Sequence, residues 1–472
     1  MKSSNLVKLM IVLDRHMAFR EVVRSRVLDS LCNKPDCEVV LVTNEACQTQ
    51  KGDLPKVANI RSYVIPLELP KTLRGRLAYV LDQILHFFTK DLGVVLFPDS
   101  SLAQIRFSRL RSRSNSILFR MAPFYFLKWI GLRNHHLALL GQCWGRYPEL
   151  ARLLDDERPD VIIYSNMILG QMDCLREARR RQIPLILDVP TWDQPTSKGP
   201  MTIRPDHAIA WSQEMKGDLV RLHNLKHDNV FVGGVLYFDS YFDRPPIESR
   251  EDFFKRLGID PEKKVINYCL SRAGSAPAAI AFIDRIYSII RDGRLGYDCQ
   301  LVVRANPLDN VKLVKQLAER KFVKLQLPKG RVNSKGASWL PDADEAEDRI
   351  AALLYSDVLL MIQSTMILDG CCMDRPIINL AYDAGEKVDE WQSVKRIFHF
   401  NHAQKYQELG STWKVTSDDE LELALKTYLS KPETHQKERR LLLEDLTSFF
   451  DGLTYQRWSN YVFDVACHYK SE

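Results

Sequence analysis

The sequence lacks any continuous apolar run of about 18 residues, the length that a membrane-spanning helix needs. Its first residues hold one short apolar run, which is typical of a strand rather than of a signal peptide. The net charge of +6 over 472 residues is too mild to indicate nucleic-acid binding. We therefore expect a cytoplasmic globular protein with no transmembrane segment.

Residues at metal-binding spacing are also missing. The 10 cysteines are scattered without two pairs at zinc-site spacing, which fits a reducing compartment. His223 and His227 lack the Glu of the zinc-protease motif and a third ligand. The Asp-x-Asp of "PDADEAED", residues 341–348, is a pattern that holds Mg²⁺ or Mn²⁺ in some transferases. Here it precedes a helix, which favours capping. No metal and no other cofactor is expected.

Short apolar runs recur along the chain, and each is followed by a loop and a helix-like stretch. Runs such as "PDVIIYS" and "SDVLLMI" are typical of parallel strands that are covered on both faces. The pattern occurs twice, on either side of a polar, proline-containing seam. We therefore predict an α/β protein with two doubly wound Rossmann-like domains that face each other across a cleft.

The predicted boundaries follow this seam. They are an N-terminal domain at 1–241 with a basic-aromatic insertion at 104–133, a linker at 242–262, a second domain at 263–454, and a C-terminal helix at 455–472.

The insertion is notable for what it lacks, because no Asp or Glu occurs from Ser100 to Pro148. Arginines and lysines alternate there with aromatic and aliphatic residues. The segment is either a helical hairpin with solvated cations or a surface that lies on an anionic membrane. Each cation near such a membrane contributes roughly 1 kcal/mol. The lack of acids favours the membrane, and no nucleic-acid-binding module accompanies the segment.

The stretch "YSDVLLMIQSTMILDGCCMDRPIINLAYD", residues 355–383, holds the first candidate site. A buried strand runs into Ser364 and Thr365 where a helix begins, so hydroxyls and helix amides suit a diphosphate. Asp369 lies about one helical turn further and could accept hydrogen bonds from a ribose. The simpler interpretation is a capped helix with a solvated acid.

Other candidates follow strand ends, where ligands bind in doubly wound sheets. In "LSRAGSAPA", residues 270–278, Gly274 would let a phosphate approach the backbone and Arg272 could neutralise it. In "DVPTWDQPTSKG", residues 188–199, Asp193 or Asp188 could act as a general base. His16 is an alternative base, since its usual pKa suits proton transfer near neutral pH. Each also fits an ordinary structural role.

Stretches in both halves of the sequence resemble a known family. "DVPTWDQPTSKG", followed by "PDHAIAWSQEMKGDL" and "VFVGGVLYFDSY", resembles the end of the N-terminal domain in bacterial surface-polysaccharide transferases of the GT-B fold. "STMILDGCCMDRPIINL" resembles the C-terminal-domain signature of GT-B glycosyltransferases, with Asp369 where that family usually has Glu. "LVVRANPLD", residues 301–309, is similar to the Arg-x-His-Pro strand end of bacterial capsule and teichoic-acid transferases, with Asn306 replacing the His. The resemblance covers residues 158–383. Met361 stands where retaining members often have a first Glu, so that acid pair is incomplete.

The resemblance implies a metal-independent glycosyltransferase. Its first domain, at 1–241, would face the acceptor, its second, at 263–454, would bind the nucleotide sugar, and the C-terminal helix at 455–472 would return to the first domain. It would move a sugar from a nucleotide sugar to a surface-glycan or lipid-linked acceptor, at the inner face of the membrane. Arg272, Arg304, Ser364 and Thr365 would stabilise the departing diphosphate. Enzyme alternatives are a glycerol-phosphate-type transferase and a sugar-nucleotide 2-epimerase of the same fold. A membrane-associated binding or scaffold protein without catalysis is the alternative of a different class.

Overall fold

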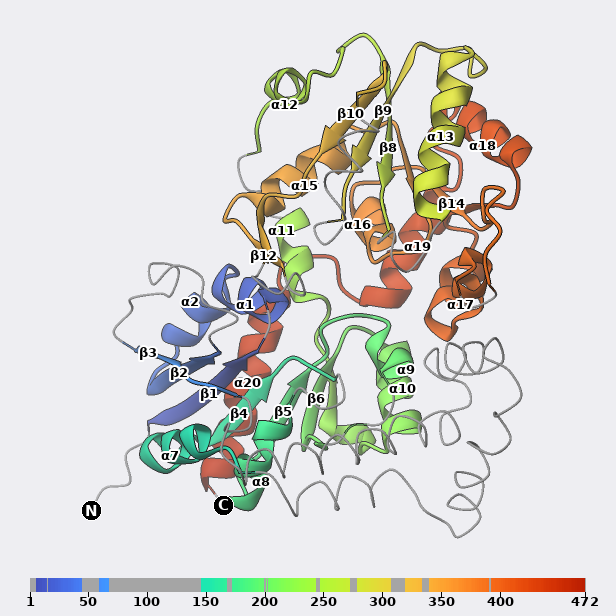
Figure 1. The fold of residues 1–472 in the computed structure, drawn as a ribbon. Coiled ribbons are helices and arrows are strands. Elements are labelled where there is room, and N and C mark those ends of the chain that lie inside the picture. Colours follow the sequence, from blue (N-terminus) through green and yellow to red (C-terminus); the bar gives the residue numbers. More distant parts are fainter. Residues whose placement is uncertain are drawn as a thin grey trace, which may run out of the picture. The chain divides into compact units, whose positions relative to one another are not determined.

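The computed structural model divides into two compact units, which Figure 1 traces by colour along the chain. The first unit comprises Met1–Asp239 with Leu446–Glu472, and the second comprises Ser240–Asp445. The residues that the structure describes are 6–14, 16–44, 59–67, 146–167, 172–198, 201, 203–242, 247–271, 278–306, 319–332, 339–389 and 392–471.

The predicted insertion at 104–133 lies outside the described residues, so its membrane contact stays a prediction. Within the described ranges, none of the helices combines the length and the apolar character needed to cross a bilayer.

The first unit is built on a seven-stranded parallel sheet in the order β3-β2-β1-β4-β5-β6-β7. Its strands are β1 (Val7–Leu13), β2 (Cys37–Thr43), β3 (Ile60–Val64), β4 (Val161–Tyr164), β5 (Leu185–Asp188), β6 (His207–Ala210) and β7 (Val230–Val232). Strand β1 pairs with β2 on one side and with β4 on the other, so the order of strands reverses there. The central strands are buried along almost their whole length, which explains their continuous apolar runs.

Helices cover this sheet. They are α1 (His16–Val23), α2 (Val27–Cys32), α7 (Pro148–Glu157), α8 (Arg176–Arg180), α9 (Gln194–Ser197), α10 (Gln213–His223) and α20 (Thr454–Ser471), with short 3-10 helices at Asp173–Leu175, His227–Asn229 and Leu236–Phe238. Phe19 of α1, Leu31 of α2 and Trp458 of α20 join one buried cluster with Ile11 of β1 and Ile163 of β4. One face of the sheet therefore packs against the two ends of the chain.

The C-terminal helix is held to the first unit by polar contacts at its start. The Asp239 carboxylate accepts hydrogen bonds from the backbone N–H groups of Thr454 (3.1 Å) and Tyr455 (2.9 Å). Arg26 donates to the Gly452 carbonyl over 2.7 Å, and its guanidinium lies 4.1 Å from the centre of the Tyr455 ring. Asp239 thus caps a helix that begins more than 200 residues later.

The second unit repeats the plan with a six-stranded parallel sheet in the order β10-β9-β8-β13-β14-β15. Its strands are β8 (Lys264–Cys269), β9 (Cys299–Arg304), β10 (Val323–Gln326), β13 (Val358–Met361), β14 (Ile377–Leu380) and β15 (Trp413–Val415); β11 (Gly330–Val332) and β12 (Trp339–Pro341) form a separate antiparallel pair. The order reverses between β8 and β13. The prediction of two doubly wound α/β domains is therefore confirmed.

Helices of the second unit follow its strands. They are α11 (Asp239–Phe242), α12 (Arg250–Leu257), α13 (Ala278–Arg291), α15 (Glu345–Leu354), α16 (Met366–Cys372), α17 (Asn401–Glu408), α18 (Asp418–Ser430) and α19 (Gln436–Thr447), with a 3-10 helix at Val394–His399. Both α11 and α19 contain a point at which the chain changes units.

Part of the predicted linker at 242–262 belongs to the core of the second unit. Phe253 and Phe254 of α12 are both buried and pack against Val265 of β8 and Val302 of β9. Because α12 is anchored in this way, the chain passes between the units at Asp239 and Ser240, close to the predicted domain end at 241.

We predict that Asp239→Ala destabilises the protein by roughly 0.5–2 kcal/mol, because the first N–H groups of α20 lose their acceptor. Urea unfolding would measure the change. Asp228→Ala is the control, since that carboxylate is almost fully exposed and such a substitution changes stability little. Equal unfolding of both variants and the parent would contradict the capping role.

Candidate functional site

The carboxyl ends of β8 and β13 lie side by side at the reversal point of the second sheet. This is where doubly wound sheets usually bind ligands. Ser364 and Thr365 follow β13 there, as the sequence placed them. Arg272 and Gly274 follow β8 in the sequence but lie outside the described residues, so their roles stay predictions.

The start of α16 combines capping with a partly exposed hydroxyl. Ser364 Oγ accepts a hydrogen bond from the Met366 backbone N–H over 3.2 Å, so this side chain already caps the helix. Thr365 occupies the N-cap position and its side chain makes no capping bond. Both residues are partly exposed. Ser364 therefore has the helix-capping role that was the simpler interpretation of this stretch. The Thr365 side chain, in contrast, does not cap the helix.

Asp369, on α16, is buried rather than solvated, with 2% of its surface exposed. The Tyr241 hydroxyl of α11 donates a hydrogen bond to Asp369 Oδ1, and Arg349 Nε of α15 lies 3.8 Å from the same oxygen. Burial raises the pKa of Tyr241 well above its ordinary value, so this hydroxyl keeps its proton and acts as the donor. Asp369 is thus held between a phenol and a guanidinium.

Arg304, at the end of β9, belongs to the same group of buried charges. Its Nη2 donates to Glu345 Oε1 over 2.6 Å and its Nη1 to Asp348 Oδ2 over 3.2 Å. Glu345 Oε2 lies 4.0 Å from Arg349 Nη1, which links Arg304 to Asp369 through α15. Two carboxylates neutralise Arg304, so a diphosphate would have to compete with them for it. Its predicted role as a diphosphate ligand is not tested by this arrangement.

The residues that join Arg304 to Asp369 were missed in the sequence. Glu345, Asp348 and Arg349 belong to the acidic "DADEAEDR" stretch, which was interpreted only as a capped helix start. The signal that could have indicated them is the spacing of Glu345, Asp348 and Arg349, which places all three on one helix. Arg304, their partner, ends the earlier strand β9. Tyr241 is the last residue of the predicted first domain, and no role was predicted for it.

The Asp-x-Asp stretch has an ordinary structural explanation. Asp344 occupies the N-cap position of α15, but its side chain pairs with Lys329 over 2.7 Å instead of capping the helix. That hydrogen bond lowers the pKa of Asp344 below its usual range. Among the residues that the structure describes, no group of three or more His, Cys, Asp or Glu side chains is suited to a metal ion.

The carboxyl edge of the first sheet also gathers polar side chains at its reversal point. Asp14 follows β1 and Asn166 follows the neighbouring strand β4, and Asn166 Nδ2 donates to Asp14 Oδ2 over 2.5 Å. The pair spans the two strands between which the order reverses. Neither residue was singled out in the sequence, although each stands directly after an apolar run.

Asp188, a predicted catalytic residue, ends β5 and is 7% exposed. Burial raises its pKa well above the ordinary value, and the nearby charge of Glu21 on α1 adds to the shift. A buried carboxyl group whose pKa is raised in this way is suited to acid–base catalysis.

Asp193, the other candidate carboxylate, is engaged within its own loop. It accepts hydrogen bonds from Thr191 Oγ1 (2.6 Å), Ser197 Oγ (2.6 Å) and Lys198 Nζ (2.9 Å). Lys198 of the same loop therefore pairs with Asp193. A catalytic role for Asp193 stays a prediction, and it would require one of these donors to move away.

The histidine candidates are placed differently. His16 begins α1, but its side chain lies outside what the structure describes. His223 is buried, and its Nε2 lies 2.8 Å from the Pro195 carbonyl of α9. Burial lowers the pKa of His223 to about 4, so it stays neutral and joins α10 to α9. His227 is exposed beside Asp228, so the two histidines form no metal pair.

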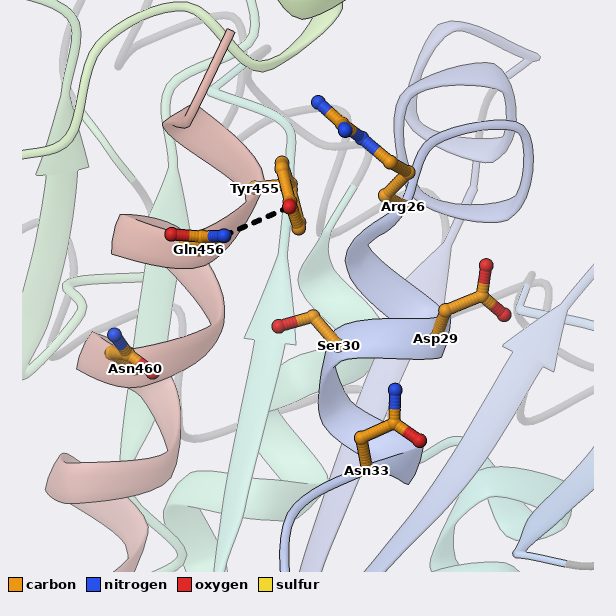
Figure 2. Close-up of a pocket in the computed structure, with 7 residues that line it drawn as sticks. All are labelled: Arg26, Asp29, Ser30, Asn33, Tyr455, Gln456 and Asn460. Carbon is orange, nitrogen blue, oxygen red and sulfur yellow. Dashed lines mark hydrogen bonds between the residues drawn. The ribbon is translucent and has the colours of Figure 1, made fainter.

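A separate polar pocket of about 420 Å³ lies between α2 and α20 of the first unit (Figure 2). Its lining is Arg26, Asp29, Ser30, Asn33, Tyr455, Gln456 and Asn460. Gln456 Nε2 donates to the Tyr455 hydroxyl over 2.9 Å within it. The pocket contains none of the predicted site residues.

Two doubly wound sheets in two units define the class of two-domain α/β enzyme folds known as GT-B. Solved structures of this class match nearly the whole chain. A UDP-GlcNAc 2-epimerase from Neisseria meningitidis bound to UDP-GlcNAc has a TM-score of 0.55 at 10% identity, covering 97% of this chain and 100% of its own. The structure of S. aureus MnaA with UDP has a TM-score of 0.55 at 12% identity, and the match covers 97% of this chain and 96% of MnaA. A glycosyltransferase from Rickettsia africae has a TM-score of 0.51 at 9% identity, and the match covers 98% of this chain and 99% of the glycosyltransferase.

The fold is therefore GT-B-like, as the sequence motifs implied. No protein-family model matches the chain, and a search of curated proteins also found no match.

We predict that Asp188→Asn stabilises the protein at neutral pH. The folded pKa of Asp188 lies above its unfolded value of about 3.9, so the stability that protonation gives is present below that value and is lost as the pH rises. Asn removes this loss, and the advantage of the variant should be a few degrees in Tm at pH 7–8 and vanish near pH 4. Thermal unfolding across this range would measure it.

Asp193→Asn serves as the contrasting variant, because removing a charge that Lys198 and two hydroxyls stabilise should lower the Tm instead. A loss of stability in Asp188→Asn that is the same at every pH would contradict a protonated Asp188.

Proposed function

We propose that the protein is an enzyme that acts on a nucleotide sugar, with the nucleotide at the carboxyl edge of the second sheet. One observation carries the proposal. Thr365 and the start of α16 follow β13 at the point where the strand order reverses, and the buried carboxylate of Asp369 lies one turn further along the helix. Hydroxyl and amide donors suit a diphosphate, and a carboxylate suits the ribose diol.

The donor diphosphate would contact the Thr365 hydroxyl and the first amides of α16, together with the loop that holds Arg272 and Gly274. Asp369 would accept hydrogen bonds from the ribose. Arg304 would then act indirectly, because it fixes Glu345, which in turn lies against Arg349 beside Asp369. The relatives bound to UDP and UDP-GlcNAc support a UDP sugar as the first donor to test.

In the first candidate reaction, the sugar passes to a surface-glycan or lipid-linked acceptor. The anomeric carbon–oxygen bond to the diphosphate breaks, a bond to the acceptor oxygen forms, and a base takes the acceptor proton. Asp188, Asp193 and His16 are the candidate bases, all in the first unit. The departing diphosphate would be stabilised by the donors of the second unit.

The second candidate reaction is epimerisation at C2 of a UDP sugar. The similarity to the Neisseria meningitidis 2-epimerase favours it, since that match has a higher TM-score than the glycosyltransferase from Rickettsia africae. The carboxyl of Asp188, whose pKa is raised by burial and by the charge of Glu21, is suited to donating a proton in this reaction. Both reactions require the same nucleotide site.

Product analysis distinguishes the reactions. The purified protein would be incubated with UDP-GlcNAc, and nucleotide products would be separated by chromatography. An epimerase should convert the donor to its 2-epimer without any acceptor, whereas a transferase should release UDP in proportion to added acceptor glycan. A protein that no UDP-, GDP-, CDP- or CMP-sugar protects against thermal unfolding would contradict the proposed function, because binding at 100 Kd should stabilise it by about 2.7 kcal/mol.

We predict that Asp369→Ala weakens UDP binding about 10- to 150-fold, because hydrogen bonds to a charged group contribute roughly 1.5–3 kcal/mol. Isothermal titration calorimetry would measure it, and circular dichroism would check folding. Since Arg349 loses a buried partner in this variant, Asp369→Asn, which keeps the side-chain size, provides a second test.

Asp344→Ala is the matched control, because its carboxylate is exposed and pairs only with Lys329 among the contacts described above. It should leave the affinity unchanged, as should a chelator. Normal UDP binding by Asp369→Ala, together with loss of binding in Asp344→Ala or in EDTA, would place the nucleotide on the Asp-x-Asp loop instead.

A further inference from the structure

The chain passes from the first unit to the second within four residues that are anchored on both sides. Residues 239–242, which form α11, are called the crossing segment here. On the first unit, the Asp239 carboxylate accepts the N–H groups of Thr454 and Tyr455. On the second unit, the Tyr241 hydroxyl donates to Asp369 Oδ1. The second anchor is therefore the same carboxylate that the proposed function assigns to the ribose.

Tyr241 is enclosed at this position. Its side chain is 2% exposed, and the guanidinium carbon of Arg349 lies 5.6 Å from the centre of its ring. The phenol therefore fills the space beside Asp369 on one side and contacts Arg349 on the other. Its hydroxyl offers the carboxylate the same O–H donor that a ribose hydroxyl would offer.

We propose that Tyr241 is a latch that holds the crossing segment on Asp369 until a nucleotide ribose takes its place. The inference rests on the proposed function, because it requires Asp369 to be the ribose acceptor. Ribose and phenol compete for one buried oxygen, so nucleotide binding breaks the Tyr241 anchor and frees the crossing segment. Tyr241 is thus a positioning residue that makes the backbone between the two units depend on whether a nucleotide is bound.

The competition has a measurable consequence for affinity. When a binding-competent state is only a fraction of the population, the apparent Kd rises by the inverse of that fraction. Removing the Tyr241 hydroxyl leaves the ring and its contact with Arg349 in place but ends the competition for Asp369. Nucleotide affinity should therefore increase rather than decrease, which is the opposite of what loss of a ligand-contacting residue would cause.

The first experiment compares Tyr241→Phe with the parent in UDP titrations by calorimetry. The expected result is binding about 10-fold tighter, which corresponds to the loss of one hydrogen bond to a charged group that the ribose must otherwise displace. Tyr63→Phe is the control, since it deletes a hydroxyl that donates to Glu157 over 2.5 Å in the first unit. It should bind UDP like the parent.

The second experiment follows backbone amide hydrogen exchange in peptides that cover 239–242. UDP should speed exchange there in the parent protein, and Tyr241→Phe should show the faster exchange without UDP. Slower exchange on UDP binding, or unchanged or weaker affinity in Tyr241→Phe, would overturn the latch and indicate that ribose and phenol bind Asp369 together.

The two proposals fail in different ways. If UDP binds and Asp369→Ala weakens it while Tyr241→Phe leaves affinity and exchange unchanged, only the latch is wrong. If no nucleotide binds, or if Asp369→Ala binds UDP normally, the ribose assignment is wrong and the latch falls with it.

Discussion

The buried carboxylate of Asp369 is the constraint on which the polar interior of the second unit depends. A carboxylate taken out of water costs several kcal/mol unless donors and cations compensate it. Arg349 and Tyr241 supply that compensation. Arg349 is itself buried and needs Glu345, and Glu345 together with Asp348 holds Arg304 at the end of β9. One buried acid on α16 thus determines how α11, α15 and β9 are joined.

The first unit meets the same constraint differently. Asp188 is buried at the end of β5 beside Glu21, and both effects raise its pKa because they disfavour the charged form. Asp193 lies in the following loop and is held by a lysine and two hydroxyls, an environment that favours the charged form. Two carboxyl groups in contrasting environments are the usual means by which an enzyme assigns acid and base roles.

The sequence predicted what local patterns encode. Continuous apolar runs identified strands such as β4 and β13, because buried parallel strands have no polar face, and the position of Thr365 at a strand end followed from the same pattern. Helix α12 was overlooked because Phe253 and Phe254 stand in a charged stretch. Tyr241 is 128 residues from Asp369, and Arg349 reaches the same acid from another helix. Pairing between distant charged and polar groups depends on the folded topology, which local spacing does not contain.

These arrangements divide the proposed chemistry between the two units. The second unit offers hydroxyl, amide and carboxylate groups in fixed positions, which suits binding of a nucleotide more than proton transfer. The first offers a buried carboxyl, Asp188, with a raised pKa, and a second carboxyl, Asp193, that accepts hydrogen bonds from a lysine and two hydroxyls, which suits proton transfer. Glycosyl transfer needs one base, whereas epimerisation at a single carbon needs a proton removed from one face and returned on the other. A first unit with both kinds of carboxyl group therefore has the residue types for either reaction, which is consistent with a fold shared by transferases and epimerases.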